Sequence, residues 1–290
     1  MSSEFSPNPA EAETASSPKR VNGLSKVGPA QDRQERIEKV IQARGFVTIE
    51  LLAQEFAVTP QTIRRDINIL ADKGSIQRYH GGAGLHSSTE NVAYNDRKVL
   101  CFEEKSSIAR MVASHIPNST SLFINIGTTT EAVARELIDH KRLRAITNNL
   151  YVASILSGND NFEVIIASGL VRPRDGGIIG PLTIDFIQQF RVDYGIIGIS
   201  GIELDGTLLD FDYREVRAAR AIIENSRKVF LVADHTKIGR NAMVRLGGVH
   251  EMDALFTDRQ PPAQLVETLN AADVELHVAA AEPAGLAARQ

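Results

Sequence analysis

Residues 58–74 read VTPQTIRRDINILADKG, and this stretch predicts an amphipathic helix with both ends marked. Thr59 followed by Pro60 is typical of a helix start, because threonine caps the first turn and proline suits the first helical position. Gly74 is the residue expected just past the helix end. The apolar residues that recur at helical spacing, and would therefore face a core, are Ile63, Ile67 and Leu70.

The opposite face of this helix carries side chains of the kinds that read base edges in the major groove. Arginine can donate two hydrogen bonds to guanine, and glutamine and asparagine can pair with adenine. Hydroxyls at a helix start can donate to phosphate oxygens. A merely solvated face is the alternative, but the surrounding pattern favours DNA binding. The residues predicted to contact DNA are Thr59, Gln61, Thr62, Arg64, Arg65 and Asn68, with Arg78 and His80 on a following wing.

The surrounding pattern, from residue 31 to residue 86, is that of a winged helix-turn-helix. A first amphipathic helix precedes Gly45, and Thr48 can cap a second, short helix. SIQRYHGGAG, at 75–84, then predicts a short strand and a glycine-rich turn. In a helix-turn-helix the second helix of the motif enters the major groove with its N-terminal part. That part of the predicted helix holds the polar face described above.

The charge of the chain argues at first against a nucleic-acid partner. The 290 residues carry a net charge of −4. The segment 31–86, however, holds eight basic and seven acidic residues and is nearly neutral. Its positive charge must therefore be concentrated on one helix face and the wing if it is to bind DNA.

Composition excludes several other classes of protein. The single cysteine, Cys101, excludes an intramolecular disulfide framework and a cysteine-based zinc site, and we interpret it as a structural thiol. Most of the histidines show no spacing suited to a metal, so we expect neither a metal nor a cofactor. No apolar run approaches the ~20 residues that span a bilayer, and the N-terminus lacks the apolar core of a signal peptide. We therefore expect a cytoplasmic protein.

From about residue 119, short β-branched runs alternate with helical segments, which predicts an α/β domain with a mostly parallel sheet. The predicted strands are 122–126, 144–147, 163–167, 194–199, 229–233, 254–257 and 274–278. The predicted helices are 130–139, 150–157, 181–190, 213–225 and 263–271. The expected division is a disordered tail (1–30), the winged helix-turn-helix (31–86), a linker with a connecting helix (87–118), an effector-binding α/β domain (119–278) and a flexible tail (279–290).

Polar or glycine-rich turns follow five successive strands and predict an anion-binding pocket. IGTTT, at 126–130, comes directly after a strand and opens a helix, so hydroxyls, backbone N–H groups and the helix dipole would converge there. Ligands of open parallel sheets bind beyond the carboxyl ends of the strands, where all five turns would meet. Ordinary turn residues are the alternative at each position, but the set favours a pocket. The predicted effector-binding residues are Asn125, Gly127, Thr128, Thr129, Thr130, Asn148, Gly169, Arg172, Ser200, Glu215 and Lys237.

Taken together, these motifs resemble the DeoR family of bacterial transcriptional regulators. RQERIEKVIQARGFVTIELLAQEFAVTPQTIRRDINILADKGSIQRYHGGA carries the N-terminal resemblance, above all through PQTIRRDI (60–67) and HGGA (80–83). The series IGTTT, TNN, SGLVR, DGGIIG, GISGI, EVRAARAIIENS and DHTKIGR is similar to the sensor domain of the family, which resembles sugar-phosphate isomerases. The resemblance runs from about residue 31 to residue 258.

The resemblance implies a repressor that binds operator DNA and is released by a phosphorylated polyol or sugar. Residues 175–244 are similar to a branch of the family that responds to glycerol 3-phosphate, which implies this inducer and target genes of glycerol and glycerol 3-phosphate metabolism. We also expect a homodimer or homotetramer, because one short helix reads few bases, and no membrane partner. Where most of the family has an aspartate this chain has Asn125, which would repel a phosphate dianion less.

An isomerase-like domain also raises an enzymatic alternative. Aldose–ketose isomerisation needs a general base beside a carbonyl, and the candidates are Asp212, Glu215 and Asp234. A helix cap and an ordinary helix charge explain the first two equally well, and glycerol 3-phosphate has no carbonyl. We therefore expect no enzymatic activity and no catalytic residue. An isomerase-like enzyme that carries a DNA-binding domain is the alternative.

Overall fold

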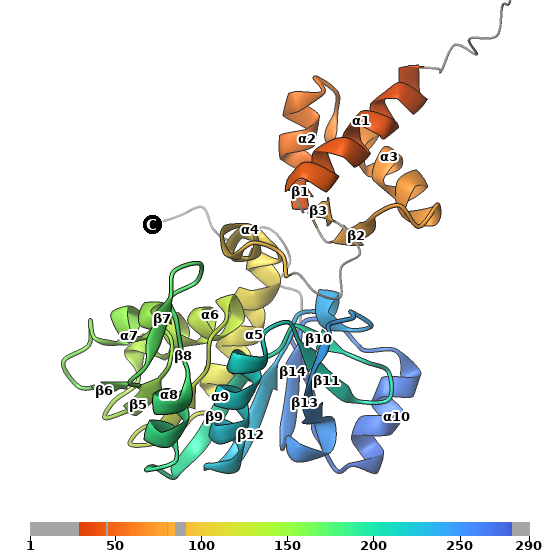
Figure 1. Ribbon diagram of the computed structural model, residues 1–290. Coiled ribbons are helices and arrows are strands. Elements are labelled where there is room, and N and C mark those ends of the chain that lie inside the picture. Colours follow the sequence, from red (N-terminus) through yellow and green to blue (C-terminus); the bar gives the residue numbers. More distant parts are fainter. Residues whose placement is uncertain (1–28, 45, 80, 85–90, 280–290) are drawn as a thin grey trace, which may run out of the picture.

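The computed structural model describes residues 29–44, 46–79, 81–84 and 91–279. Figure 1 shows two parts, a small N-terminal head and a larger α/β domain, with α4 (Tyr94–Val99) between them. Most of the two expected tails, and the predicted DNA contact His80, lie outside the described residues. In the described part of the chain, no helix combines the length and apolarity needed to cross a bilayer.

The head is a winged helix-turn-helix, as the sequence predicts. Its elements are α1 (Pro29–Arg44), β1 (Phe46–Thr48), α2 (Ile49–Glu55), α3 (Pro60–Asp72), β2 (Gln77–Tyr79) and β3 (Gly82–Gly84). The helices pack their apolar stripes into one core, and the strands form an antiparallel sheet of order β1-β3-β2. The predicted helix start is confirmed, because the Thr59 hydroxyl accepts a hydrogen bond from the Thr62 N–H at 3.2 Å. α1 begins at Pro29, which places the last two residues of the expected tail in a helix.

The wing of the head requires glycine at Gly82. A Cβ atom at this position would collide with the ring of Phe46 and the carbonyl oxygen of Val47, because β3 runs close against β1. Gly81, just before it, has a φ of +85°, a conformation that side chains with a Cβ rarely adopt. The glycine pair of the HGGA motif therefore has a steric origin.

The larger domain is built on a seven-stranded parallel sheet of order β15-β14-β12-β9-β4-β5-β6, which confirms the predicted fold class. Its strands are β4 (Ser121–Ile124), β5 (Arg144–Thr147), β6 (Glu163–Ile166), β9 (Val192–Gly198), β12 (Ser226–Val232), β14 (Ala254–Thr257) and β15 (Glu275–Val278). One face is covered by α5 (Phe102–Ser114), α6 (Thr128–Glu136) and α7 (Leu150–Leu156), and the other by α8 (Pro181–Ile187), α9 (Tyr213–Glu224) and α10 (Ala263–Ala271) (Figure 1). Successive strand residues alternate between the two cores: Leu122 and Ile124 join one, and Phe123 joins the other.

The strand order reverses once, between β4 and β9. From the central β4 the chain adds β5 and β6 on one side, and it then places β9, β12, β14 and β15 on the other. At such a reversal the connections leave the two central strands in opposite directions, and a crevice opens beyond their carboxyl ends. The topology therefore places a ligand site between the turn after β4 and the turn after β9.

Several short elements were not indicated by the sequence. They are β1 and β3 of the head, α4, the hairpin of β7 (Leu170–Arg172) and β8 (Gly177–Ile179), the antiparallel sheet of β10 (Gly201–Ile202), β11 (Thr207–Asp210) and β13 (Val244–Gly248), and the 3₁₀ turns η2 (His235–Lys237) and η3 (Val249–Glu251). A further 3₁₀ turn, η1 (Leu137–Asp139), forms the end of the predicted helix 130–139. Most of these segments are too short to show a period in the sequence. The predicted main strands and helices are all present, with ends shifted by a few residues.

An ion pair between the partly buried Arg33 and the buried Asp66 ties α1 to α3 inside the head. Asp66 is 2% exposed. Its carboxylate accepts hydrogen bonds from the Arg33 guanidinium at 2.6 and 3.3 Å and from the Gln34 amide at 3.0 Å. Although Asp66 follows Arg64 and Arg65 in the sequence, it therefore turns inward, and both arginines remain on the exposed face.

Replacing Asp66 by alanine should lower the free energy of unfolding of the head by about 2–4 kcal/mol, because Arg33 and Gln34 lose a buried acceptor. Chemical unfolding of the full chain, followed by circular dichroism, measures this change. Asp72→Ala, at the exposed end of the same helix, is the matched control and should change the free energy by less than about 0.5 kcal/mol. Equal effects of the two substitutions would contradict the structural role of the ion pair.

Candidate functional site

The polar face of α3, opposite its buried apolar stripe, is exposed along most of its length. We call it the reading face, because it carries the residues that the sequence predicts to read DNA bases. Its exposed residues are Gln61, Arg64, Arg65 and Asn68. Arg78, in β2, donates a hydrogen bond to the Asn68 side-chain oxygen at 2.9 Å, which joins the wing and the helix into one polar surface. At the helix start the hydroxyls of Thr59 and Thr62 lie 2.9 Å apart. The contact of these residues with DNA stays a prediction.

Part of this reading face borders a cleft between the head and the larger domain. The cleft is lined from the head by Arg64, Asn68 and Arg78, among others, and from the larger domain by His235, Thr236, Ile238 and Arg259. Gln61 and Arg65 are not part of its lining. The predicted DNA contacts Arg64, Asn68 and Arg78 therefore border the larger domain across this cleft, whereas Gln61 and Arg65 do not.

A narrow pocket opens at the crevice between β4 and β9, where the topology places it. The turn after β4 contributes residues 126–129, the turn after β9 contributes residues 198–200, and Lys237 enters from η2. Gly127 has a φ of +154°, which lets the chain pass from β4 directly into α6. The first N–H groups of α6 have no acceptor within the helix, so they and the helix dipole favour an anion in front of them.

The pocket brings together six of the predicted effector-binding residues. They are Gly127, Thr128, Thr129, Ser200, Glu215 and Lys237. The other five do not belong to its lining: Asn125, Thr130, Asn148, Gly169 and Arg172. The Thr130 hydroxyl is instead bonded to the carbonyl oxygens of Asn125 and Gly127 at 2.8 and 2.7 Å and shapes the turn. Gly169 keeps space for the Thr183 hydroxyl, which a Cβ would hit.

Two buried amides near the pocket have side-chain oxygens without a hydrogen-bond partner among the described residues. These are the Oδ1 atoms of Asn125 and Asn148. Both residues are 1% exposed. A buried acceptor that stays unpaired costs roughly 1–3 kcal/mol. A hydroxyl that reached either oxygen would remove this cost, so both asparagines stay predicted effector contacts.

Arg172 is the centre of a buried ion cluster. Each of its three guanidinium nitrogens donates to a carboxylate of Asp175, Asp212 or Glu215, at 2.6 to 2.8 Å. These carboxylates belong to the β7–β8 connection and to the start of α9. Arg172 therefore fixes the hairpin against α9 and holds Glu215 at the pocket wall, and its own contact with an effector stays a prediction.

Sequence reasoning missed two charged residues of the pocket, Arg97 and Asp210. Arg97 belongs to α4 and lies 3.6 Å from the Asp175 carboxylate. Its Nε has no hydrogen-bond partner among the described residues. Asp210 ends β11 and accepts a hydrogen bond from the Ser200 hydroxyl at 3.1 Å. The sequence contains no signal for these two residues, because they lie in α4 and β11, two short elements that were not themselves predicted.

Burial sets the charge state of the pocket. Desolvation lowers the pKa of Lys237 to about 7, although Asp234 acts in the opposite direction. Desolvation and the charge of Asp210 raise the pKa of Glu215 to about 7, although Arg172 opposes this. Desolvation also raises the pKa of Asp210. A phosphate dianion favours the protonated form of each group, so the pocket becomes more receptive to it as protons bind.

Hydrogen bonds connect the pocket to the segment that precedes α5. The Asn91 side-chain amide donates to the Ser200 hydroxyl at 3.2 Å. The Tyr94 hydroxyl donates to the buried carboxylate of Glu131, in α6, at 2.9 Å. With Arg97 in the pocket wall, the pocket is therefore in direct contact with the segment from Asn91 to Val99.

Family models match both parts of the chain. A model described as the DeoR-like helix-turn-helix domain matches residues 33–89, and one described as the DeoR C terminal sensor domain matches residues 101–259. The chain belongs to the DeoR family. In the terms of this family, α3 lies in the helix-turn-helix domain, and most of the pocket lining lies in the sensor domain.

Curated relatives in the DeoR family match over nearly their whole length. The glycerol-3-phosphate regulon repressor of Escherichia coli is 53% identical, over 85% of this chain and 98% of the relative. Its namesake in Haemophilus influenzae is 52% identical, over 79% of this chain and 89% of the relative. The HTH-type transcriptional repressor CsqR of Escherichia coli is 44% identical, over 84% and 94%.

Among solved structures, the chain matches part of the ribose 5-phosphate isomerase A of Neisseria gonorrhoeae. It is 14% identical, has a TM-score of 0.35, and matches 46% of this chain and 52% of the isomerase. A likeness of this size concerns the fold alone.

Binding of a phosphate ester to the pocket should weaken at least about tenfold between about pH 6.5 and about pH 8.5. Across this interval Lys237 loses its positive charge and Glu215 gains a negative one, since both have a pKa of about 7. The ester itself, with a second pKa of about 6, is mostly a dianion throughout. Titration calorimetry measures the affinity at each pH.

Glu215→Gln and Lys237→Met should each flatten this pH dependence, because each removes one titrating group. A wild-type affinity that stays constant across the interval would contradict the assignment of these two groups to the binding site.

Proposed function

We propose that this protein represses genes of glycerol and glycerol 3-phosphate metabolism and that glycerol 3-phosphate releases it from operator DNA. One observation carries the proposal: a pocket suited to phosphate lies in a chain that is 53% identical to a glycerol-3-phosphate regulon repressor. The winged helix-turn-helix supplies the DNA-binding part, and the sensor domain supplies the switch.

The chemistry of the pocket suits glycerol 3-phosphate. The phosphate group would sit before the first N–H groups of α6, at Thr128 and Thr129, and face Lys237 and Arg97. The two hydroxyls of the glycerol part need acceptors, and Asp210 or the unpaired oxygen of Asn125 can provide them. A neutral amide at Asn125 adds no negative charge beside the dianion.

The switch would act through α4. An occupant attracts Arg97 away from Asp175 and also contacts Ser200, which is bonded to Asn91. Both contacts act on the segment from Asn91 to Val99, which reaches the wing through a few residues of chain. A coupling free energy of about 1–3 kcal/mol would relieve repression about 5–150-fold. We propose that the resulting change in head orientation removes the reading face from the operator.

Arg65→Ala should weaken operator binding about 5–150-fold, because an arginine that pairs with guanine contributes about 1–3 kcal/mol. Affinity for glycerol 3-phosphate should not change. Gel-shift titration at a fixed salt concentration measures the first, since phosphate contacts make the affinity depend on salt. Calorimetry measures the second.

Lys39→Ala is the matched control, since it removes the same charge from an exposed position on α1. Equal loss of operator binding in both variants would contradict specific reading by Arg65. Loss of glycerol 3-phosphate binding in Arg65→Ala would indicate unfolding instead.

Combining Lys237→Ala with Thr129→Ala should give a repressor that glycerol 3-phosphate no longer releases, because the phosphate loses its lysine and a hydroxyl beside the α6 N-terminus. A gel shift with operator DNA and increasing glycerol 3-phosphate measures release. Lys228→Ala, an exposed lysine in β12, is the control and should respond normally. A normal response of the double variant would contradict the pocket assignment.

We also propose a homodimer or homotetramer whose subunits meet at the β6 side of the sheet. β6 is an edge strand. Large apolar side chains are exposed from β6 to α8: Ile166 (42%), Leu170 (65%), Val171 (42%) and Leu182 (66%). Exposed apolar surface beside a free strand edge is typical of an interface. Two reading helices related by symmetry would bind operator half-sites about 10–10.5 base pairs apart, or multiples of this spacing.

Leu170→Asp with Leu182→Asp should convert the protein to monomers, because two charges would be buried at the interface. Light scattering during size-exclusion chromatography measures the mass. Met243→Asp, in which a 63% exposed apolar residue outside this surface is changed, is the control and should keep the wild-type mass. An unchanged mass in the double variant would contradict the proposed interface.

An isomerase-like enzyme is the second candidate, and one observation favours it. Glu215 has a pKa of about 7, in the range suited to a general base. Burial would raise the pKa of Asp212, but hydrogen bonds from Arg214 and Arg172 lower it. Burial would also raise the pKa of Asp234, but the charge of Lys237 lowers it. Because glycerol 3-phosphate has no carbonyl, we propose that no catalysis occurs; turnover of aldose phosphates would favour the alternative.

We propose that the chain is divided into a DNA-binding head (31–86), a connecting segment (87–118) and an effector domain (119–278). The first helix of the head, α1, starts slightly earlier, at Pro29. We further propose that the protein works in the cytoplasm, where operator DNA is accessible to it.

A further inference from the structure

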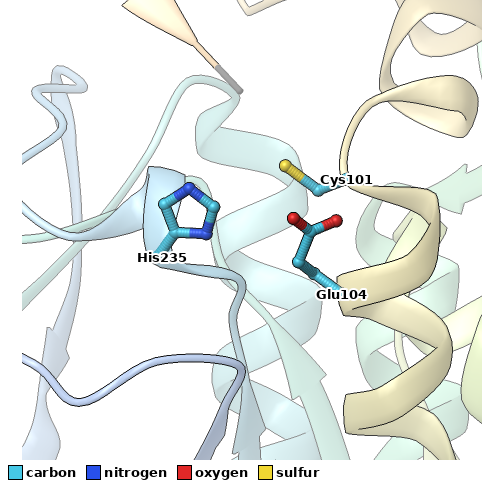
Figure 2. A group of neighbouring side chains, drawn as sticks. All are labelled: Cys101, Glu104 and His235. Atoms are coloured by element: carbon cyan, nitrogen blue, oxygen red, sulfur yellow. The ribbon is translucent and has the colours of Figure 1, made fainter. Parts of the chain in front are cut away.

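We propose that Cys101, Glu104 and His235 form a binding site for Zn²⁺ or a similar transition metal at the joint between the head and the larger domain. One ligand atom of each residue, namely sulfur, carboxylate oxygen and ring nitrogen, lies within 4.8 Å of the others. Cys101 and Glu104 stand at the start of α5, and His235 begins η2. Figure 2 shows the three side chains gathered around one space.

The mixture of ligand atoms selects the class of metal. Thiolate, imidazole and carboxylate together are typical of Zn²⁺ sites, whereas Mg²⁺ and Ca²⁺ prefer oxygen alone. Bond lengths of about 2.0–2.3 Å place the ligand atoms of a tetrahedral Zn²⁺ site roughly 3.5 Å apart. Side-chain movements of about an ångström would therefore bring these three groups to bonding distance.

Asp258 already orients His235 as a metal ligand would need. One Asp258 oxygen lies 2.7 Å from the His235 Nδ1, and the other accepts the His235 backbone N–H at 2.6 Å. Metal-bound histidines usually have such a carboxylate on the second ring nitrogen, which fixes the ring and its tautomer. With Nδ1 engaged in this way, Nε2 is the nitrogen that would bind the metal.

Cys101 gives an independent indication of a ligand. The residue is 5% exposed, and its sulfur makes no hydrogen bond with any residue that the structure describes. Its backbone has a φ of +52°, which is uncommon for a residue other than glycine. A strained backbone that holds a buried, unpartnered thiol beside a carboxylate and an imidazole points to a functional constraint.

The position of the site would link the two parts of the protein. Three protein ligands leave a fourth coordination position. Glu50 of the head borders both neighbouring cavities, one with His235 and the other with Cys101 and Glu104. A bound metal would also compete with Arg259, which lies 3.6 Å from Glu104. It would tie η2, the turn that carries Lys237, to α5 directly below the head.

Titration of the chelator-treated full chain with Co²⁺ tests this site. Cys101 is the single cysteine, so charge-transfer absorption from thiolate to Co²⁺ reports on this site alone. We expect the absorption to saturate at one Co²⁺ per chain, to disappear when Zn²⁺ is added, and to be absent in Cys101→Ser. Wild-type protein that binds no Co²⁺, or binds it without this absorption, would overturn the proposal.

Variants of the histidine and its carboxylate separate a metal site from a simple hydrogen-bond cluster. Asp258→Asn should weaken Co²⁺ binding about 10–100-fold, and His235→Ala should weaken it further. His250→Ala removes an exposed histidine elsewhere and should bind Co²⁺ like the wild type. Unchanged Co²⁺ affinity in His235→Ala would refute the ligand set, provided that circular dichroism shows the variant to be folded.

Discussion

The single reversal of strand order between β4 and β9 is the constraint on which the pocket depends. Because all seven strands of the main sheet are parallel, their polar turns meet at one edge. Only at the reversal do neighbouring connections diverge and leave space for a ligand. Gly127, Ser200 and Lys237 follow three different strands, and they share a pocket because those strands are neighbours in the order β12-β9-β4.

Within that crevice the arrangement of buried charges determines which residues can respond to an anion. Arg172 donates to three carboxylates and supports the hairpin against α9, and its contact with an effector stays a prediction. Among the residues that the structure describes, Arg97 has a long ion pair with Asp175, and its Nε has no hydrogen-bond partner. Removing a partner from a buried charge costs several kcal/mol, whereas supplying a missing one is favourable. We therefore propose that a phosphate group in the pocket would act mainly on Arg97, and through it on α4.

The sequence was sufficient for the main elements and for the part of the pocket that follows strands. IGTTT and DHTKIG could be recognised because each combines a strand end with glycine, hydroxyls or a lysine, and the parallel sheet then brings such turns together. The sequence did not identify Arg97 and Asp210 as pocket residues, because they lie in a short helix and a short strand that show no periodicity. The sequence also did not predict that the Asp66 side chain is buried, since its partners Arg33 and Gln34 lie on a different helix.

Tertiary contacts also explain why the sequence does not indicate the proposed metal site. Cys101 has Glu104 one helical turn away, but no spacing rule connects it to His235, which the sheet topology brings to the start of α5. The stretch from Asn91 to Glu104 contacts the pocket, because Asn91 is bonded to Ser200 and Arg97 lines the pocket. The same stretch contributes Cys101 and Glu104 to the proposed metal site, and it follows the wing in the sequence. A head that is nearly neutral would gain little from bulk charge in binding DNA, so under the proposed function a small reorientation would be enough to weaken the specific contacts predicted for α3. We therefore propose that this short segment, which contacts the pocket and adjoins the head, controls operator binding without any large change in the sheet domain.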